Sequence, residues 1–114
     1  MEAIQHCFSA SSVEGIFENL KTENTAWAQV TLKNLEKCSP LSLKITFEQL
    51  QKAKHLDFSH CLKMEGILTK NFLKDPNFYE GIRALLIDKD QHPRWEPNTL
   101  ALVSEKQINH FFNF

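Results

Sequence analysis

Residues 39–50 read SPLSLKITFEQL, and this stretch predicts a helix whose start is well defined. Ser39 can cap the free backbone amides of a helix, and Pro40 at the first helical position loses no hydrogen bond. The stretch then places apolar side chains at helical positions, namely Leu43, Ile45, Phe47 and Leu50. Because this pattern fades into residues 52–54, we expect the helix to end there.

The same kind of start signal recurs on both sides of this helix. Five further starts are marked by capping side chains, which are Ser11 (in a capping box with Glu14), Thr25, Asp57, Asp75 (followed by Pro76) and Ser104 (in a capping box with Gln107). A polar break at residues 21–24 is expected to end the first of these helices. The prediction is an all-α fold, a single domain over residues 1–114 that forms a small bundle of about five to six helices. Only the short apolar runs 84–87 and 100–103 leave room for a strand.

Composition excludes several classes of protein. The chain has 114 residues, and its 13 Lys plus Arg against 14 Asp plus Glu give a net charge of −1, which disfavours nucleic-acid binding. No apolar run reaches the length of about 18 residues that a membrane span needs. The three cysteines form no CxxC pair and predict reduced thiols in a cytoplasmic compartment, or in the mitochondrial matrix for a eukaryotic source.

The residues that could carry chemistry do not form a catalytic or metal-binding pattern. The three glycines each follow a glutamate inside a helical stretch, so they cannot build a phosphate-cradling loop. Adjacent donors such as His60 and Cys61 point about 100° apart on a helix, so each such pair could offer one metal ligand at most. We therefore expect no catalytic residue, no metal and no cofactor in this chain.

Two stretches resemble one enzyme family. Residues 39–50 resemble the S-P-x-S-L-K-x-T helix of 3-hydroxyisobutyryl-CoA hydrolases, members of the enoyl-CoA hydratase/isomerase (crotonase) superfamily. Residues 75–90, DPNFYEGIRALLIDKD, with PRWEP at 93–97, resemble that family's F-x-E-G-[VI]-R-A-x-L-I-D-K-D-x-x-P-x-W-x-P block. Weaker similarity elsewhere extends the resemblance over essentially the whole chain, in the family's order.

The resemblance implies that a larger part is missing. Family members carry an N-terminal ββα crotonase core, in which backbone amides polarise the thioester carbonyl and acidic residues assist the attack of water. The chain is then the C-terminal helical part of such a protein, as an expressed piece, a proteolytic remnant or a separately encoded polypeptide. The implied reaction of the parent is hydrolysis of (S)-3-hydroxyisobutyryl-CoA in valine breakdown, with no catalysis by this chain alone.

The resemblance also assigns roles within the matched block. Lys89 is the position at which we expect a contact with a phosphate of CoA, and the competing prediction is a salt bridge from Lys89 to Asp88 or Asp90. Arg83 is expected to pair with Glu80 at i, i+3. The aromatic residues Phe78 and Trp95 are expected to be core or docking anchors rather than ligand-stacking groups.

Nine phenylalanines are more than the core of a small bundle needs. We therefore expect exposed apolar helix faces that pack on the crotonase core of the parent protein or on another copy of the chain, giving a homo-oligomer. Two alternatives stay open. One is a stand-alone helical interaction or regulatory module, and the other is an unrelated metal-binding helical protein.

Overall fold

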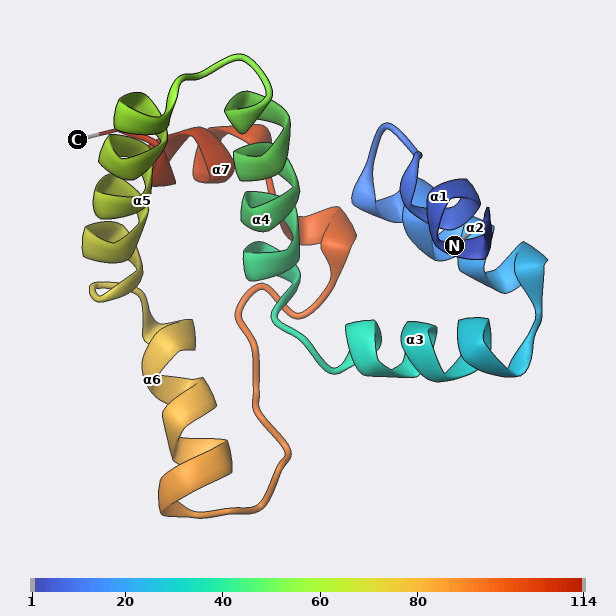
Figure 1. The fold of residues 1–114 in the computed structure, drawn as a ribbon. Coiled ribbons are helices and arrows are strands. Elements are labelled where there is room, and N and C mark those ends of the chain that lie inside the picture. The colour runs from blue at the N-terminus through green and yellow to red at the C-terminus, as the bar shows by residue number, and fades with distance from the viewer. Residues whose placement is uncertain (1, 114) are drawn as a thin grey trace.

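The computed structural model describes residues 2–113, and over that range the chain is helical and contains no strand. Its α-helices, shown in Figure 1, are α1 (Glu2–Phe8), α2 (Val13–Glu23), α3 (Ala26–Glu36), α4 (Pro40–Ala53), α5 (Phe58–Phe72), α6 (Pro76–Ile82) and α7 (Glu105–Phe111). A π-helical turn, η1 (Arg83–Ile87), continues α6, and a 3-10 turn, η2 (Leu100–Leu102), precedes α7. The all-α prediction is confirmed: helical turns cover the run 84–87 and the first three residues of the run 100–103.

Five of the predicted helix starts are confirmed by their caps. The side chains of Thr25, Ser39, Asp57, Asp75 and Ser104 each accept a hydrogen bond from a backbone N–H two or three residues further on, at 2.8 to 3.2 Å. Pro40 and Pro76 open their helices, as the sequence predicts. These boundaries were predictable because a cap and its amide are close neighbours along the chain.

The first part of the chain differs from its prediction in three ways. Ser12, not Ser11, caps α2, accepting from the Gly15 N–H at 3.0 Å, and the predicted partner Glu14 pairs instead with Lys44 of α4 at 2.7 Å. Helix α2 also runs through the expected polar break and stops at Asn24, whose φ of 50° is left-handed. The apolar repeat ends before the helix does. Polar residues such as Lys21 and Glu23 still favour the helical backbone, so the helix continues past the last apolar position.

Helix α1 was not predicted at all. Its seven residues make only about two turns, and Ile4 and Phe8 stay 47% and 41% exposed. One side chain anchors the helix: Cys7 is completely buried against α2 and α3, in a small core with Ile16, Leu20 and Ala28. Ile4, Cys7 and Phe8 stand at the helical spacing i, i+3 and i+4, but so short a pattern is weak evidence for a helix.

A second and larger core lies among α4, α5 and α7. It is formed by six buried residues, which are Leu41, Ile45, Met64, Leu68, Val103 and Phe111. Helices α1 to α3 form an arm on one side of this core, and α6 with η1 forms another that extends away from it (Figure 1). The two cores are linked by the ion pair between Glu14 and Lys44. The candidate functional site lies on the arm that α6 begins.

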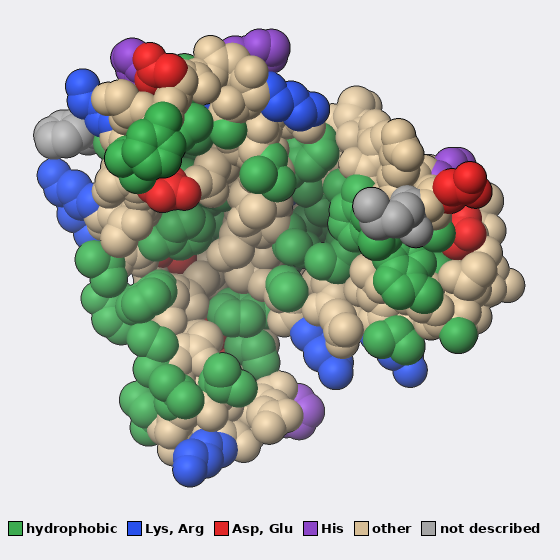
Figure 2. All heavy atoms as spheres, viewed as in Figure 1, with side chains coloured by type: hydrophobic (Ala, Val, Ile, Leu, Met, Phe, Trp, Pro, Cys, Tyr) green, Lys and Arg blue, Asp and Glu red, His purple; other side chains and the backbone are tan. Residues whose placement is uncertain are grey.

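The chain is more open than a compact domain of its size. The Cα radius of gyration is 15.2 Å, against about 13 Å for a compact chain of this length. Its accessible surface is 8139 Å², against about 6,400 Å² for a compact monomer of this mass. Figure 2 shows hydrophobic side chains along the arm that α6 and η1 form, where Leu85, Leu86 and Ile87 are 62% to 70% exposed.

Among the described residues, no helix is both long and apolar enough to cross a membrane.

Candidate functional site

A groove of about 780 Å³ lies between α6 with η1 and the irregular segment that follows them. It is lined mainly by apolar residues, together with the polar residues Lys37, Lys89, Asp90, Gln91 and His92. Three residues singled out from the sequence, Phe78, Lys89 and Trp95, meet in this groove. A mostly apolar groove with a few polar groups is the usual form of a small-molecule site.

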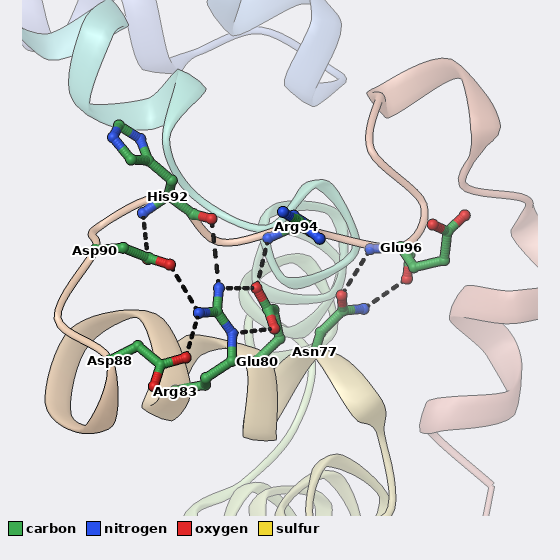
Figure 3. A network of polar contacts seen from close by, with 8 residues as sticks. All are labelled: Asn77, Glu80, Arg83, Asp88, Asp90, His92, Arg94 and Glu96. Atoms are coloured by element: carbon green, nitrogen blue, oxygen red, sulfur yellow. Dashed lines mark hydrogen bonds and ion pairs between the residues drawn. The ribbon is translucent and has the colours of Figure 1, made fainter.

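Arg83 is the centre of a network that holds the following segment against α6 (Figure 3). Its Nε and Nη2 atoms donate to the two carboxylate oxygens of Glu80 at 2.8 and 2.6 Å, which confirms the predicted i, i+3 pair. Its Nη1 atom donates to Asp88 at 2.8 Å and to Asp90 at 2.7 Å. The competing prediction, in which Asp88 or Asp90 pairs with Lys89, is therefore wrong in this structure, because Arg83 binds both carboxylates.

Backbone hydrogen bonds fold the same segment back on the π-helical turn. The Asp88 N–H donates to the Arg83 carbonyl at 2.8 Å, and the Gln91 N–H donates to the Ala84 carbonyl at 2.9 Å. Lys89 and Gln91 adopt left-handed backbone conformations with φ of 55° and 56°. Such conformations cost a non-glycine residue about 1–2 kcal/mol. The surrounding bonds must supply that free energy, so the position of Lys89 depends on the network.

Two further bonds extend the network along the loop. The Arg94 N–H donates to Glu80 at 2.7 Å, and the His92 N–H donates to Asp90 at 2.9 Å. The Arg83 side chain and the Arg94 N–H together lower the pKa of Glu80 from its ordinary value of 4.5 to about 2. The same guanidinium and the His92 N–H hold the pKa of Asp90 below its ordinary value. Both carboxylates are therefore ionised at neutral pH.

The lowered pKa of Glu80 predicts an acid-sensitive loop. Since the folded pKa lies below the unfolded one, the ionised group stabilises the fold above about pH 4.5, and that contribution is lost as the pH falls towards 2. We expect the urea midpoint of unfolding to fall more between about pH 5 and about pH 3 in the wild type than in Glu80→Gln. Equal pH dependence of the two proteins would show that Glu80 carries no such stabilisation.

Trp95 and Asn77 fix the far end of the loop. The Trp95 indole N–H donates to the Lys37 carbonyl at 2.9 Å, and a Cβ at Gly81 would lie 3.3 Å from the indole ring. The bond to Lys37 holds Trp95 within the fold, whereas Phe78 is 41% exposed and belongs to neither core. The choice between docking anchor and ligand-stacking group stays a prediction for both residues.

Asn77 is 5% exposed, donates to the Glu96 carbonyl at 2.7 Å and accepts from the Glu96 N–H at 2.8 Å. Sequence reasoning missed the role of Asn77.

None of the cysteines lines this groove, and His92 is the one histidine among the described residues that does. Burial raises the pKa of the Cys7 thiol, which makes it a poor nucleophile at neutral pH. His60 Nδ1 lies 2.7 Å from an Asp57 carboxylate oxygen within one turn of α5. Residues 2–113 contain no group of three or more His, Cys, Asp and Glu side chains placed to hold a metal ion.

The fold and the groove define an all-α chain that presents a lysine-bearing loop beside a mostly apolar groove. The sequence pattern of the enoyl-CoA hydratase/isomerase family matches residues 1–112, and the chain belongs to this family. The chain is 46% identical to the mitochondrial 3-hydroxyisobutyryl-CoA hydrolase of Danio rerio and 43% identical to that of Homo sapiens. Each match covers 98% of this chain and 29% of the relative.

Solved structures of enzymes named for CoA compounds also match this chain over about a third of their own length. A carnitinyl-CoA dehydratase from Mycobacterium thermoresistibile matches with a TM-score of 0.91 at 28% identity, over 98% of this chain and 32% of that one. An enoyl-CoA hydratase from Rhodobacter sphaeroides 2.4.1 matches with a TM-score of 0.88 at 31% identity, over 97% and 33%. The family resemblance inferred from the sequence motifs is confirmed. The fold agrees with the helical C-terminal part of a crotonase-like enzyme.

Proposed function

We propose that this chain acts as the C-terminal helical segment of a 3-hydroxyisobutyryl-CoA hydrolase-like enzyme of valine catabolism, and that Lys89 binds a phosphate of CoA. The observation that carries the proposal is the position of Lys89, beside a mostly apolar groove in a chain whose relatives are named for CoA thioesters. Since the curated relatives are mitochondrial proteins, a eukaryotic chain of this kind would work in the mitochondrial matrix.

The chemistry of the groove supports a phosphate-bearing ligand. CoA carries a diphosphate and a 3′-phosphate, and a lysine ammonium binds phosphate as a compact point charge. Lys89 makes no ion pair or hydrogen bond with any residue in the range 2–113, and Lys37 lines the same groove. The apolar residues that line the same groove can cover the less polar parts of the ligand.

Exposed apolar surface supports a large protein partner. The total accessible area, polar and apolar together, exceeds that of a compact monomer by roughly 1,700 Å². A standard interface buries about 800 Å² on each side. The crotonase core of the parent protein, or a second copy of this chain, would cover such a surface. The same surface favours the second candidate, a stand-alone helical interaction or regulatory module that binds its partner without contributing to catalysis.

Calorimetric titration with CoA tests the proposal. We expect the wild-type chain to bind CoA and Lys89→Ala to bind about tenfold more weakly, a loss of about 1.4 kcal/mol. The matched control is Lys63→Ala, which removes an exposed lysine of α5 and should leave the affinity unchanged. Equal affinities for the wild type and Lys89→Ala would contradict the assignment of Lys89.

Two readouts on the same samples separate the candidate functions. An assay for thiol release from 3-hydroxyisobutyryl-CoA should give no turnover, and turnover by this chain alone would overturn the segment hypothesis. Light scattering should show association through the apolar faces. A strictly monodisperse monomer that binds no hydrophobic dye would contradict a docking role. Association without any CoA binding would favour the interaction module.

A further inference from the structure

We infer that Arg83 is a positioning residue for Lys89: it binds the two carboxylates that flank Lys89 and so keeps the lysine ammonium available at the groove. The inference rests on the proposed function only in naming CoA as the ligand that the ammonium meets. The arrangement of charges around Lys89 can be tested without any ligand.

The sequence order Asp88, Lys89, Asp90 would by itself allow the lysine charge to be neutralised by its acidic neighbours. A lysine with an acidic residue on each side can pair with either one, and such a pair would compete with a bound phosphate for the ammonium. Arg83 removes both competitors, because its Nη1 atom bonds the carboxylates of Asp88 and Asp90 at 2.8 and 2.7 Å. A guanidinium suits this role because its planar fork serves several carboxylates in fixed directions.

Glu80 fixes the guanidinium from the opposite side. Its two oxygens accept from Nε and Nη2, which sets the plane of the group and aims Nη1 at the loop. Figure 3 shows the side chains of Glu80, Asp88 and Asp90 converging on Arg83. The side chains of Arg83 and Glu80 are only 30% and 20% exposed, so this pair is screened by water less than an open surface pair.

The backbone turns Lys89 away from this cluster. With φ of 55° at Lys89 and 56° at Gln91, the chain directs Asp88 and Asp90 to Arg83 and leaves Lys89 lining the groove. Asp90 also reaches the groove, but Arg83 offsets its charge there. The result is a loop with two acidic residues that still presents an unpaired cation.

Charge removal separates this role from simple support of the loop. In Arg83→Met, Asp88 and Asp90 become free to pair with Lys89, and we expect CoA affinity to fall about tenfold. In the triple variant Arg83→Met, Asp88→Asn and Asp90→Asn, neither flanking carboxylate competes for the ammonium, and the affinity should return to within about threefold of the wild type. If the triple variant binds as weakly as Arg83→Met, Arg83 only supports the loop fold and the inference is wrong.

A ligand-free readout keeps this test separate from that of the proposed function. Amine labelling followed by mass spectrometry measures how fast Lys89 reacts, with Lys63 as the internal reference. We expect Lys89 to react severalfold more slowly in Arg83→Met, and at the wild-type rate in the triple variant. Unchanged labelling in Arg83→Met would overturn the inference, whether or not CoA binds. The expected labelling pattern without any CoA binding would retain the inference and reject CoA as the ligand.

The conservative variant Arg83→Lys covers the case in which Arg83→Met does not fold. A lysine keeps the positive charge but lacks the planar fork, so it can serve fewer of the three carboxylates at once. We expect intermediate labelling of Lys89 in this variant. Labelling at the wild-type rate in a folded Arg83→Lys protein would show that the fork is not needed, and would contradict the inference.

Discussion

Replacing Leu41 with alanine is expected to lower the free energy of unfolding by about 3 kcal/mol. Leu41 is completely buried in the first turn of α4, in the core that it forms with residues of α5 and α7. The change removes apolar contacts and leaves a cavity that rigid helices fill only in part. Urea denaturation followed by circular dichroism measures the effect as a lower midpoint.

Leu50→Ala is the matched control for this prediction. Leu50 lies on the same helix but is 62% exposed, so its truncation should change the free energy of unfolding by less than about 0.5 kcal/mol. A small loss for Leu41→Ala, similar to that of the control, would show that the core among α4, α5 and α7 is not tightly packed in solution.

The size of this effect matters because the chain has little core to lose. Ten of its buried apolar residues form two clusters, one of six residues and one of four. Folded domains are stable by only about 5–15 kcal/mol, so the loss at Leu41 would be a large fraction of the total. Burial of the exposed apolar surface by a partner would add to that stability. This is a physical reason to expect the segment to work within a larger assembly.

Local signals explain how much of the fold could be predicted. Thr25, Ser39 and Asp57 cap their helices with amides three residues away, and that distance along the chain is fixed by helix geometry. Helix α1 escaped prediction because its apolar pattern covers only about two turns, and Cys7 is its one buried residue. The end of α2 was placed too early because polar side chains on a solvent-facing helix look like a break.

The candidate site was predictable in its residues but not in their pairing. The matched block drew attention to Arg83 and Lys89, and the i, i+3 spacing gave the pair with Glu80. Asp88 and Asp90 bind Arg83 rather than Lys89 because of the π-helical turn and the left-handed backbone at Lys89 and Gln91. No sequence pattern predicts either of these backbone features. The contact of Trp95 with Lys37 joins residues 58 positions apart and likewise needs the folded chain.

Asn77→Ala is expected to cost about 2 kcal/mol, although alanine favours the helix that this residue occupies. The asparagine amide pairs with both the N–H and the carbonyl of Glu96, at 2.8 and 2.7 Å, and holds the end of the loop that carries Lys89. Removing it leaves two backbone groups without partners in a half-buried place, where each unmade hydrogen bond is costly.

Urea denaturation measures this loss, and hydrogen exchange at the Glu96 amide locates it. The Glu96 N–H should exchange faster in Asn77→Ala, because its acceptor is gone. Asn77→Asp sharpens the argument: it keeps an oxygen for the Glu96 N–H but faces the Glu96 carbonyl with a carboxylate, so its loss should be at least as large. The control is Asn109→Ala on the exposed face of α7, which should change little. If Asn77→Ala unfolds like this control and the Glu96 amide stays protected, then Trp95 and the Arg83 network alone hold the loop.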